Sequence, residues 1–128
     1  MHCKTITIDS ISPHFSGELA ESYFVLYRLT HEQKYRDYAW QFAQAIREHC
    51  RSDANAPYPG SYSIVKDVTK VPSTRSLYQS VDLLSITFKY LYLIFCDDDV
   101  MPLDQWVFNA TGQPLPIKGK SSAYKSSK

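Results

Sequence analysis

Apolar residues recur at helical spacing through the first part of the chain. Between residues 16 and 31 they lie on one helical face, with Ser16 available as an N-cap and Glu18 in the first turn. That face consists of Leu19, Tyr23, Phe24, Leu26 and Tyr27. The period returns in 32–51 with Tyr35, Tyr38, Ala39, Phe42, Ala45 and Ile46. Because the two segments follow each other so closely, the pattern predicts an antiparallel helical hairpin.

The pattern changes after residue 51. Prolines and a glycine gather in 52–74 around a short β-like run, 61–65, which predicts a long ordered loop or a small hairpin. Residues 77–95 then predict a third helix, apolar on nearly every side in its second half. A helix of that kind must be surrounded by other elements.

The chain closes with shorter elements. Pro102 ends any continuation of the third helix, and 103–108 predicts one turn or a short strand. Asp97, Asp98 and Asp99 read as a solvated helix end, where acidic groups oppose the helix dipole. The expected division is an irregular N-terminal segment, 1–15, a folded domain, 16–117, and a disordered tail rich in Lys and Ser, 118–128.

Composition and charge exclude several classes of function. The 128 residues suffice for one domain, and 14 basic against 13 acidic side chains leave a net charge of +1, which gives no electrostatic reason to bind nucleic acid. The apolar run 81–95 is too short for a membrane span and contains Asp82 and Lys89. Residues 1–15 hold no apolar core of signal-peptide length. We therefore expect no membrane segment, signal or anchor in this chain.

Cysteine and histidine spacing indicates no metal centre. Cys3, Cys50 and Cys96 are an odd number at spacings that fit neither a disulfide framework nor a zinc site, so buried thiols are the simplest interpretation. The four histidines show no metal-ligand spacing either. No metal ligand is assigned.

Residues 89–109, followed by the Pro-Leu-Pro-Ile run at 114–117, carry the most specific signal. They resemble the C-terminal signature of the class I α-1,2-mannosidases, glycoside hydrolase family 47. The resemblance implies a mainly all-α fold in which this run joins the last inward-facing helix of an (α/α)7 barrel to a hairpin that plugs the barrel. Such a barrel needs a chain several times longer. The expectation is thus a C-terminal barrel fragment, consisting of a helical hairpin, one long buried helix and a short β-like plug.

The resemblance extends to the first two predicted helices, through the runs 21–24, 26–28 and 34–36. It places Glu18 at the glutamate of the family's Leu-Arg-Pro-Glu motif, a catalytic carboxylate generally taken as the base that activates water. Glu21 matches a second family glutamate, near the bound sugar. Inverting glycosidases need two carboxyl groups about 6.5 to 9.5 Å apart, and the acid lies in barrel segments this chain does not contain.

Several positions depart from the family pattern. The Arg-Pro before the glutamate is Ser16-Gly17, a site glutamate is Ile86, and an aromatic position is Asp82. Ala110 stands where the family has a threonine that binds calcium, with Thr111 one residue later. Calcium takes six to eight oxygen ligands, so losing that hydroxyl weakens the site. The family's cofactor is calcium, and we expect this chain alone to bind it poorly.

Two functional hypotheses follow. By resemblance, the chain is part of a calcium-dependent mannosidase that trims high-mannose N-glycans in the endoplasmic reticulum or Golgi lumen. The alternative is an inactive truncated remnant or a helical binding module. A complete family member would bury Leu83, Leu84, Phe88, Leu91 and Phe95. In the chain alone, part of that surface should stay exposed and favour self-association.

Overall fold

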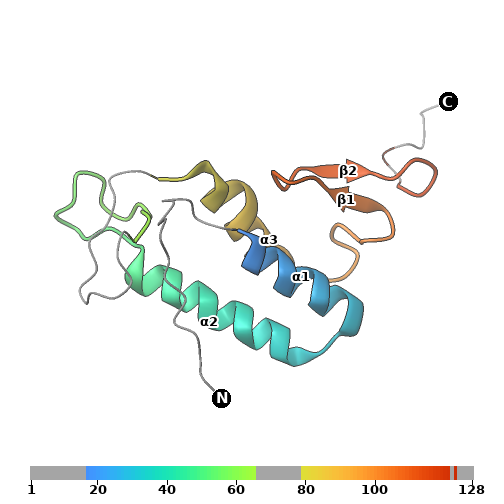
Figure 1. The fold of residues 1–128 in the computed structure, drawn as a ribbon, viewed down its shortest axis with the longest axis horizontal. Helices are drawn as coiled ribbons and strands as arrows, with labels where there is room; N and C mark the ends of the chain where they lie inside the picture. The colour runs from blue at the N-terminus through green and yellow to red at the C-terminus, as the bar shows by residue number, and fades with distance from the viewer. Residues whose placement is uncertain (1–16, 66–78, 122, 124–128) are drawn as a thin grey trace, which may run out of the picture.

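The computed structural model describes residues 17–65, 79–121 and 123. Helix α1 spans Glu18–Thr30 and α2 spans Gln33–His49, and the two lie side by side and run in opposite directions (Figure 1). This agrees with the predicted helical hairpin. His31 makes the sharp turn between them, with a left-handed φ of 55° and its N–H donating to the Tyr27 carbonyl at 2.7 Å.

The start of α1 differs from the prediction. Gly17 occupies the N-cap position and makes no side-chain capping bond, while the predicted cap, Ser16, lies outside the described residues. The helix depends instead on the packing of its buried face.

The third predicted helix is shorter than expected and is not uniform. A π-helical segment, η1, spans Leu83–Phe88 and continues directly into α3, Lys89–Leu93. The Ser80 hydroxyl accepts a hydrogen bond from the Asp82 N–H at 3.2 Å and so marks its beginning, whereas residues 77–78 lie outside the described residues. A π-turn widens the helix and shifts the side chains around it, and such turns are frequent at functional sites.

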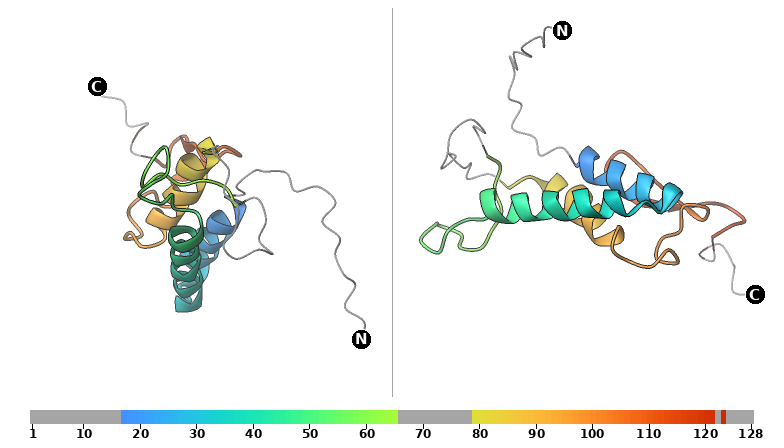
Figure 2. Two further views of the ribbon diagram at one scale, coloured as in Figure 1. Left: turned by 90° about the vertical axis from the view of Figure 1, so that its left-hand side faces the viewer. Right: turned by 90° about the horizontal axis from the view of Figure 1, so that it is seen from below.

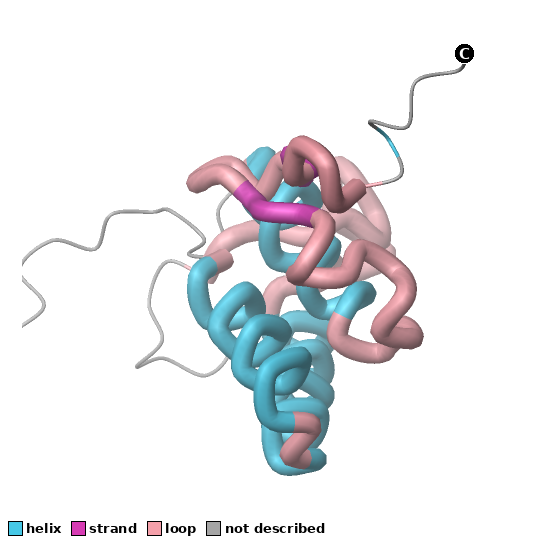
Figure 3. The backbone as a smooth tube through the Cα atoms, turned by 90° about the vertical axis from the view of Figure 1, so that its right-hand side faces the viewer, coloured by secondary structure: helices cyan, strands magenta, loops and turns pink. Residues whose placement is uncertain are grey.

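A two-stranded hairpin forms where the sequence predicts a short β-like element. Strand β1, Trp106–Phe108, pairs antiparallel with β2, Pro114–Pro116. In Figure 3 the two strands lie in the upper part of the view, above the paired helices. Just after residue 117, the Ser121 N–H donates to the Ile117 carbonyl at 3.0 Å, and Ser121 is buried. Apart from residues 118–121 and 123, the predicted tail lies outside the described residues, as does the predicted segment 1–15.

The segment after α2 forms a closed loop at the opposite end of the elongated molecule (Figure 2). Arg51 and Tyr62 form an antiparallel bridge at its base. Within it, the Ser52 N–H donates to the Ser61 carbonyl at 2.7 Å. The described part, 51–65, therefore matches the predicted small hairpin, and 66–78 lie outside the described residues.

The core is built around an aromatic cluster. Phe24 of α1 and Tyr90 of α3 are fully buried with ring centroids 5.4 Å apart. Phe108 of β1 meets Phe24 at 6.0 Å and Tyr90 at 5.3 Å, both edge-on. Such arrangements add to the burial of the rings themselves. One cluster thus joins α1, α3 and the hairpin.

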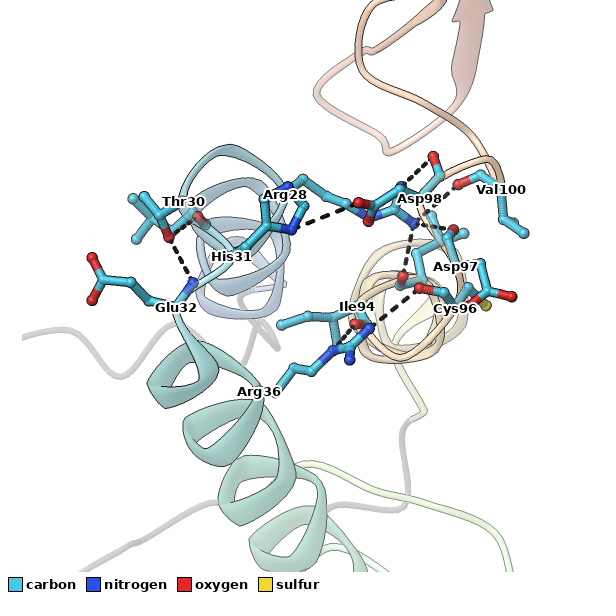
Figure 4. Close-up of polar contacts among 12 residues, drawn as sticks. Arg28, Thr30, His31, Glu32, Arg36, Ile94, Cys96, Asp97, Asp98 and Val100 are labelled. Carbon is cyan, nitrogen blue, oxygen red and sulfur yellow. Dashed lines mark hydrogen bonds and ion pairs between the residues drawn. The ribbon is translucent and has the colours of Figure 1, made fainter.

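Two arginines cap the C-terminal end of α3, where their side chains reach across from α1 and α2 (Figure 4). Arg28 is buried, and its guanidinium donates to the carbonyls of Leu93, Asp97, Asp98 and Val100 at 2.8 to 3.1 Å. Arg36 donates to the carbonyls of Ile94 and Cys96. The Asp98 carboxylate lies 3.5 Å from Arg28 Nε and 3.6 Å from His31 Nδ1. The acidic run that the sequence assigned to a solvated helix end is thus also tied to α1.

Part of the apolar surface remains uncovered. Leu83 and Leu91 are buried, whereas Leu84 is 59% and Phe95 45% exposed. On α2, Trp40 is also exposed and its ring stands edge-on to Phe95, with centroids 6.1 Å apart. No helix within the described ranges is long and apolar enough to cross a membrane.

Candidate functional site

The candidate site lies where the start of α1, the π-helical segment and the turn of the hairpin meet. Glu18 and Glu21 both belong to the first turn of α1, where carboxylates are favoured by the helix dipole. Glu18 is exposed, whereas Glu21 is partly buried. The Tyr90 hydroxyl donates to Glu21 Oε1 at 3.2 Å, so one of the two predicted carboxylates is oriented by a residue 69 positions away.

Tyr90 is suited to hold that carboxylate. Burial of its side chain raises the pKa of the Tyr90 hydroxyl, and the negative charge of Glu21 together with their hydrogen bond raises it further. The hydroxyl therefore keeps its proton at physiological pH and remains a donor. Because the Tyr90 ring is fixed between Phe24 and Phe108, the donor cannot easily turn away.

Lys89 brings a positive charge to the same region. Partial burial lowers the pKa of its ammonium group, and the Glu21 charge opposes that shift. Nζ lies 5.1 Å from the Tyr90 ring centroid and 5.4 Å from that of Phe108. Attraction to the ring faces and to Glu21 offsets part of the desolvation of the cation. The site thus pairs a held carboxylate with a nearby cation.

Ile86 closes the space between the three elements. A methyl group built on Gly17 would lie 2.4 Å from Ile86 Cγ2, so Gly17 permits a close approach that no larger residue allows. One built on Gly112 would lie 3.4 Å from Ile86 Cγ1, an ordinary contact, but only 2.9 Å from the Ser85 carbonyl oxygen. Gly17 and Ile86, two positions that the resemblance marks as altered, are thus in direct contact.

The adjacent residue carries an unpartnered hydroxyl. Thr87 is fully buried, and its Oγ1 has no hydrogen-bond partner among the described residues. A methyl group on Gly17 would lie 3.2 Å from this oxygen. A buried hydroxyl without a partner is uncommon and costs stability, so its position beside the π-turn marks the region as one not optimised for stability alone.

The turn of the hairpin is organised by Asn109. Its Oδ1 accepts hydrogen bonds from the backbone N–H of Thr111 at 3.1 Å and of Gln113 at 2.8 Å, and from the Thr111 hydroxyl at 2.9 Å. Gly112 follows with a positive φ of 72°. The Thr111 hydroxyl is therefore already engaged within the turn. Ala110, where the resemblance expects a calcium-binding threonine, is exposed.

The arrangement supplies some components of a hydrolytic site. Glu18 is an exposed carboxylate that can accept a proton from water, and Glu21 is an oriented acceptor for a hydroxyl group. Within the described ranges, no group of three His, Cys, Asp or Glu side chains is placed to hold a metal ion. Asp82 approaches the Ser80 hydroxyl at 3.4 Å, which is a local contact at the start of the helix.

Sequence reasoning singled out the two glutamates and the altered positions as candidates, and it missed the contacts that these residues make with other elements. Tyr90 and Lys89 were assigned to an apolar helix, with no local signal of a link to Glu21. The hairpin turn, in contrast, had a local signal at Gly112, because a glycine shortly after Asn and Thr is typical of a turn that needs positive φ. The contact between Gly17 and Ile86 joins residues distant in sequence and required coordinates.

The fold and site define a class of protein: it is mainly helical, and two carboxylates lie beside a β-hairpin. Residues 13–117 match the profile of Glycosyl hydrolase family 47. The chain therefore belongs to this glycosyl hydrolase family.

Named relatives agree with that assignment. The chain is 45% identical over 108 residues to a mannosyl-oligosaccharide alpha-1,2-mannosidase IA of Drosophila melanogaster, covering 84% of this chain and 15% of the relative. It is 45% identical over 120 residues to the mannosidase MNS3 of Arabidopsis thaliana, covering 92% and 18%. A human mannosidase IB is 43% identical over 100 residues, covering 78% and 15%. The chain thus spans less than a fifth of the length of these relatives.

Proposed function

We propose that this region is part of an α-1,2-mannosidase that removes terminal α-1,2-linked mannose from high-mannose N-glycans with inversion of configuration. The observation that carries the proposal is the hydrogen bond from Tyr90 to Glu21, the residue that the family resemblance assigns to the vicinity of the bound sugar. Membership in the family and the names of its relatives support the substrate class. The corresponding location is the lumen of the endoplasmic reticulum or Golgi, and the corresponding complete fold is an (α/α)7 barrel.

The two carboxylates have different proposed roles. Glu18, exposed at the first turn of α1, acts as the base that takes a proton from the attacking water. Glu21 accepts a hydrogen bond from a sugar hydroxyl through the oxygen atom that Tyr90 leaves unused. The general acid that protonates the leaving oxygen comes from outside these 128 residues. Inversion requires that acid on the opposite side of the sugar from the water.

Calcium does not fit the donor set of this chain. Ala110 offers only a backbone carbonyl where a hydroxyl is needed, and the Thr111 hydroxyl is engaged with Asn109. The described ranges bring together no cluster of carboxylates around the turn. We therefore derive no step through a metal. Reverting Ala110 to Thr is the change that would restore a side-chain ligand.

A second function is favoured by Ile86. Its side chain fills the space between Gly17 and Gly112, and an isoleucine cannot accept a hydrogen bond from a sugar. In this second candidate the chain is a non-catalytic helical module that retains the packing of the family. The two candidates differ in whether Glu18 ever acts on water, so they can be separated by activity.

The first test uses the chain as it stands. The purified chain is incubated with a labelled high-mannose glycan, with and without calcium, and free mannose is measured beside the E18Q variant. Mannose release that depends on Glu18 supports the first candidate for this chain alone. A folded chain that releases no mannose supports the second candidate for the isolated chain.

A chimera tests the role of the region within a longer enzyme. The matching segment of the Drosophila mannosidase is replaced by this sequence, with and without I86E. We expect I86E to raise activity, and E18Q to lower it about 10²- to 10⁴-fold in that background, the usual effect of losing one general base. A folded, active chimera that is indifferent to E18Q would contradict the assignment of Glu18.

A further inference from the structure

A second candidate binding site lies in the closed loop after α2, apart from the glutamates. A cavity of about 370 Å³ opens there between the loop and the residue that precedes the third helix. Six of its lining residues carry the argument: Ser52, Tyr58, Ser61, Tyr62, Ser63 and Gln79. A cavity of this size lies within the range of small-molecule sites.

The loop is held in shape by its own hydrogen bonds. The Ser61 and Ser52 hydroxyls lie 3.0 Å apart, and the Ser61 hydroxyl also lies 2.7 Å from the Tyr58 carbonyl. At the base, the Ser63 N–H donates to the Cys50 carbonyl at 2.8 Å. Tyr62 is anchored by an edge-on contact with Phe88, at 5.2 Å between centroids. A ligand would thus meet a largely preformed wall, which lowers the entropy lost on binding.

The chemistry of the wall indicates a neutral, hydroxyl-rich ligand. Among the described residues that line the cavity none is charged, so a phosphate or a carboxylate would find no counter-ion. Hydroxyls and one amide can exchange hydrogen bonds with a polyol, and Tyr58, which is 71% exposed, offers an aromatic face at the rim. A large exposed aromatic ring beside polar groups suits the apolar face of a sugar ring.

Ser63 lies just behind the wall of the cavity. The residue is 7% exposed, and its hydroxyl is buried with no hydrogen-bond partner among the described residues, so a ligand does not reach it directly. The polar groups that face a ligand are the hydroxyls of the other lining residues and the Gln79 amide. We infer that this loop cavity binds a neutral saccharide, with Tyr58 as the platform and the Ser52 and Ser61 hydroxyls and Gln79 as polar contacts.

This site would operate whether or not Glu18 and Glu21 catalyse hydrolysis. The apolar groove lined by Trp40, Phe88 and Phe95 is unlike it, because its walls carry few polar groups. A saccharide should therefore favour the loop cavity over that groove.

The test is an NMR titration of the ¹⁵N-labelled full chain with α-1,2-mannobiose, with methyl α-glucopyranoside and glycerol as comparison ligands. We expect saturable shifts on the amides of the 58–63 loop and on the Gln79 side chain with at least one of the two saccharides, and none with glycerol. No saturable shift in the loop, or equal shifts with glycerol, would overturn the proposal.

Three variants sharpen the result. Y58A should abolish the shifts, while Y92A, which removes another exposed tyrosine outside the cavity, should leave them unchanged. S63A, which removes a buried hydroxyl with no partner among the described residues, should leave them unchanged as well. Undiminished affinity in Y58A would refute the assignment even if the loop responds to sugar.

Discussion

The two ends of the third helix are built by opposite means. At its C-terminal end, Arg28 and Arg36 donate to six backbone carbonyls, four and two respectively. At its N-terminal end, the π-helical segment contains the Thr87 hydroxyl, which has no partner among the described residues, and Ile86, which packs tightly against Gly17. The first end gives its backbone carbonyls charged donors and serves as scaffold, although Arg28 Nε is buried and makes only the 3.5 Å ion pair with Asp98. The second end leaves a buried hydroxyl unpaired where the family resemblance locates its chemistry, as expected of functional regions and their descendants.

The largest expected effect is at the arginine-capped end. R28M should lower the free energy of unfolding by about 3 kcal/mol or more, because it leaves several carbonyls without their charged donor. Chemical denaturation followed by circular dichroism measures this. R47M, which removes an exposed arginine from α2, is the matched control and should change stability little. Similar losses in both variants would remove the contrast between the two ends.

The next effect concerns the contact between Gly17 and Ile86. Gly17 has an ordinary φ of −77°, so G17A imposes no backbone strain, and its cost should come mainly from the clash with Ile86, with a further tight contact at 3.2 Å to Thr87 Oγ1. We expect G17A to destabilise by roughly 1 to 3 kcal/mol, as overpacking does.

The cost should shrink when Ile86 is truncated. In an I86A background the clash with Ile86 Cγ2 at 2.4 Å is removed while the one with Cβ at 2.6 Å stays, so G17A should destabilise by less than in the parent chain. A double-mutant cycle by urea unfolding measures the coupling. If G17A stabilises the parent chain, the two residues are not in tight contact.

The unpartnered Thr87 hydroxyl predicts that its removal will increase the stability of the chain. T87V keeps the shape of the side chain and removes a buried polar group, so it should stabilise the chain by about 1 kcal/mol. T30V is its control, because the Thr30 hydroxyl donates to the Leu26 carbonyl at 2.7 Å and its loss should not stabilise. Melting temperatures of the two variants decide the comparison. A loss on T87V would mean that the hydroxyl has a partner in solution.

The smallest expected effect concerns the Tyr90 hydroxyl, whose contribution to stability depends on pH. Y90F should cost about 0.5 to 1 kcal/mol near neutral pH through loss of the bond to Glu21. Because the pKa of Tyr90 is raised above its ordinary value of 10.0 in the folded state, the unfolded state loses this proton first. Stability from this group should fall as pH rises above about 10, and Y90F should reduce that slope. Unfolding curves from pH 8 to 11 compare the two. Parallel slopes would contradict the buried position of the hydroxyl.

The helices could be predicted because their signals are local. Apolar spacing in α1 and α2 located both within two residues of their ends, since one face of each helix is buried. The third helix was predicted at the correct place, but the predicted range, 77–95, is longer than the observed helix. Its end at Leu93 depends on arginines from two other helices, and its π-turn has no periodic signature.

The site was only partly accessible from sequence for the same reason. The family resemblance located Glu18, Glu21 and Ile86 one at a time. The bond from Tyr90 to Glu21 and the packing of Gly17 on Ile86 join α1 to residues about 70 positions further along the chain. Composition and spacing cannot reveal such pairings, because no local pattern distinguishes a tyrosine that packs from one that also holds a carboxylate.

Because Trp40 is exposed beside the third helix, its fluorescence can report on whether the surface of that helix is covered. Its indole is 57% exposed and stands at the edge of Phe95, whereas Trp106 is partly buried in the hairpin. An indole in water emits at longer wavelength than one enclosed by protein. When another helix or a second copy of the chain covers the groove, the emission of Trp40 should move toward the blue and become shielded from quenchers. The molecule therefore carries its own fluorescent indicator of whether it stands alone or within a larger assembly.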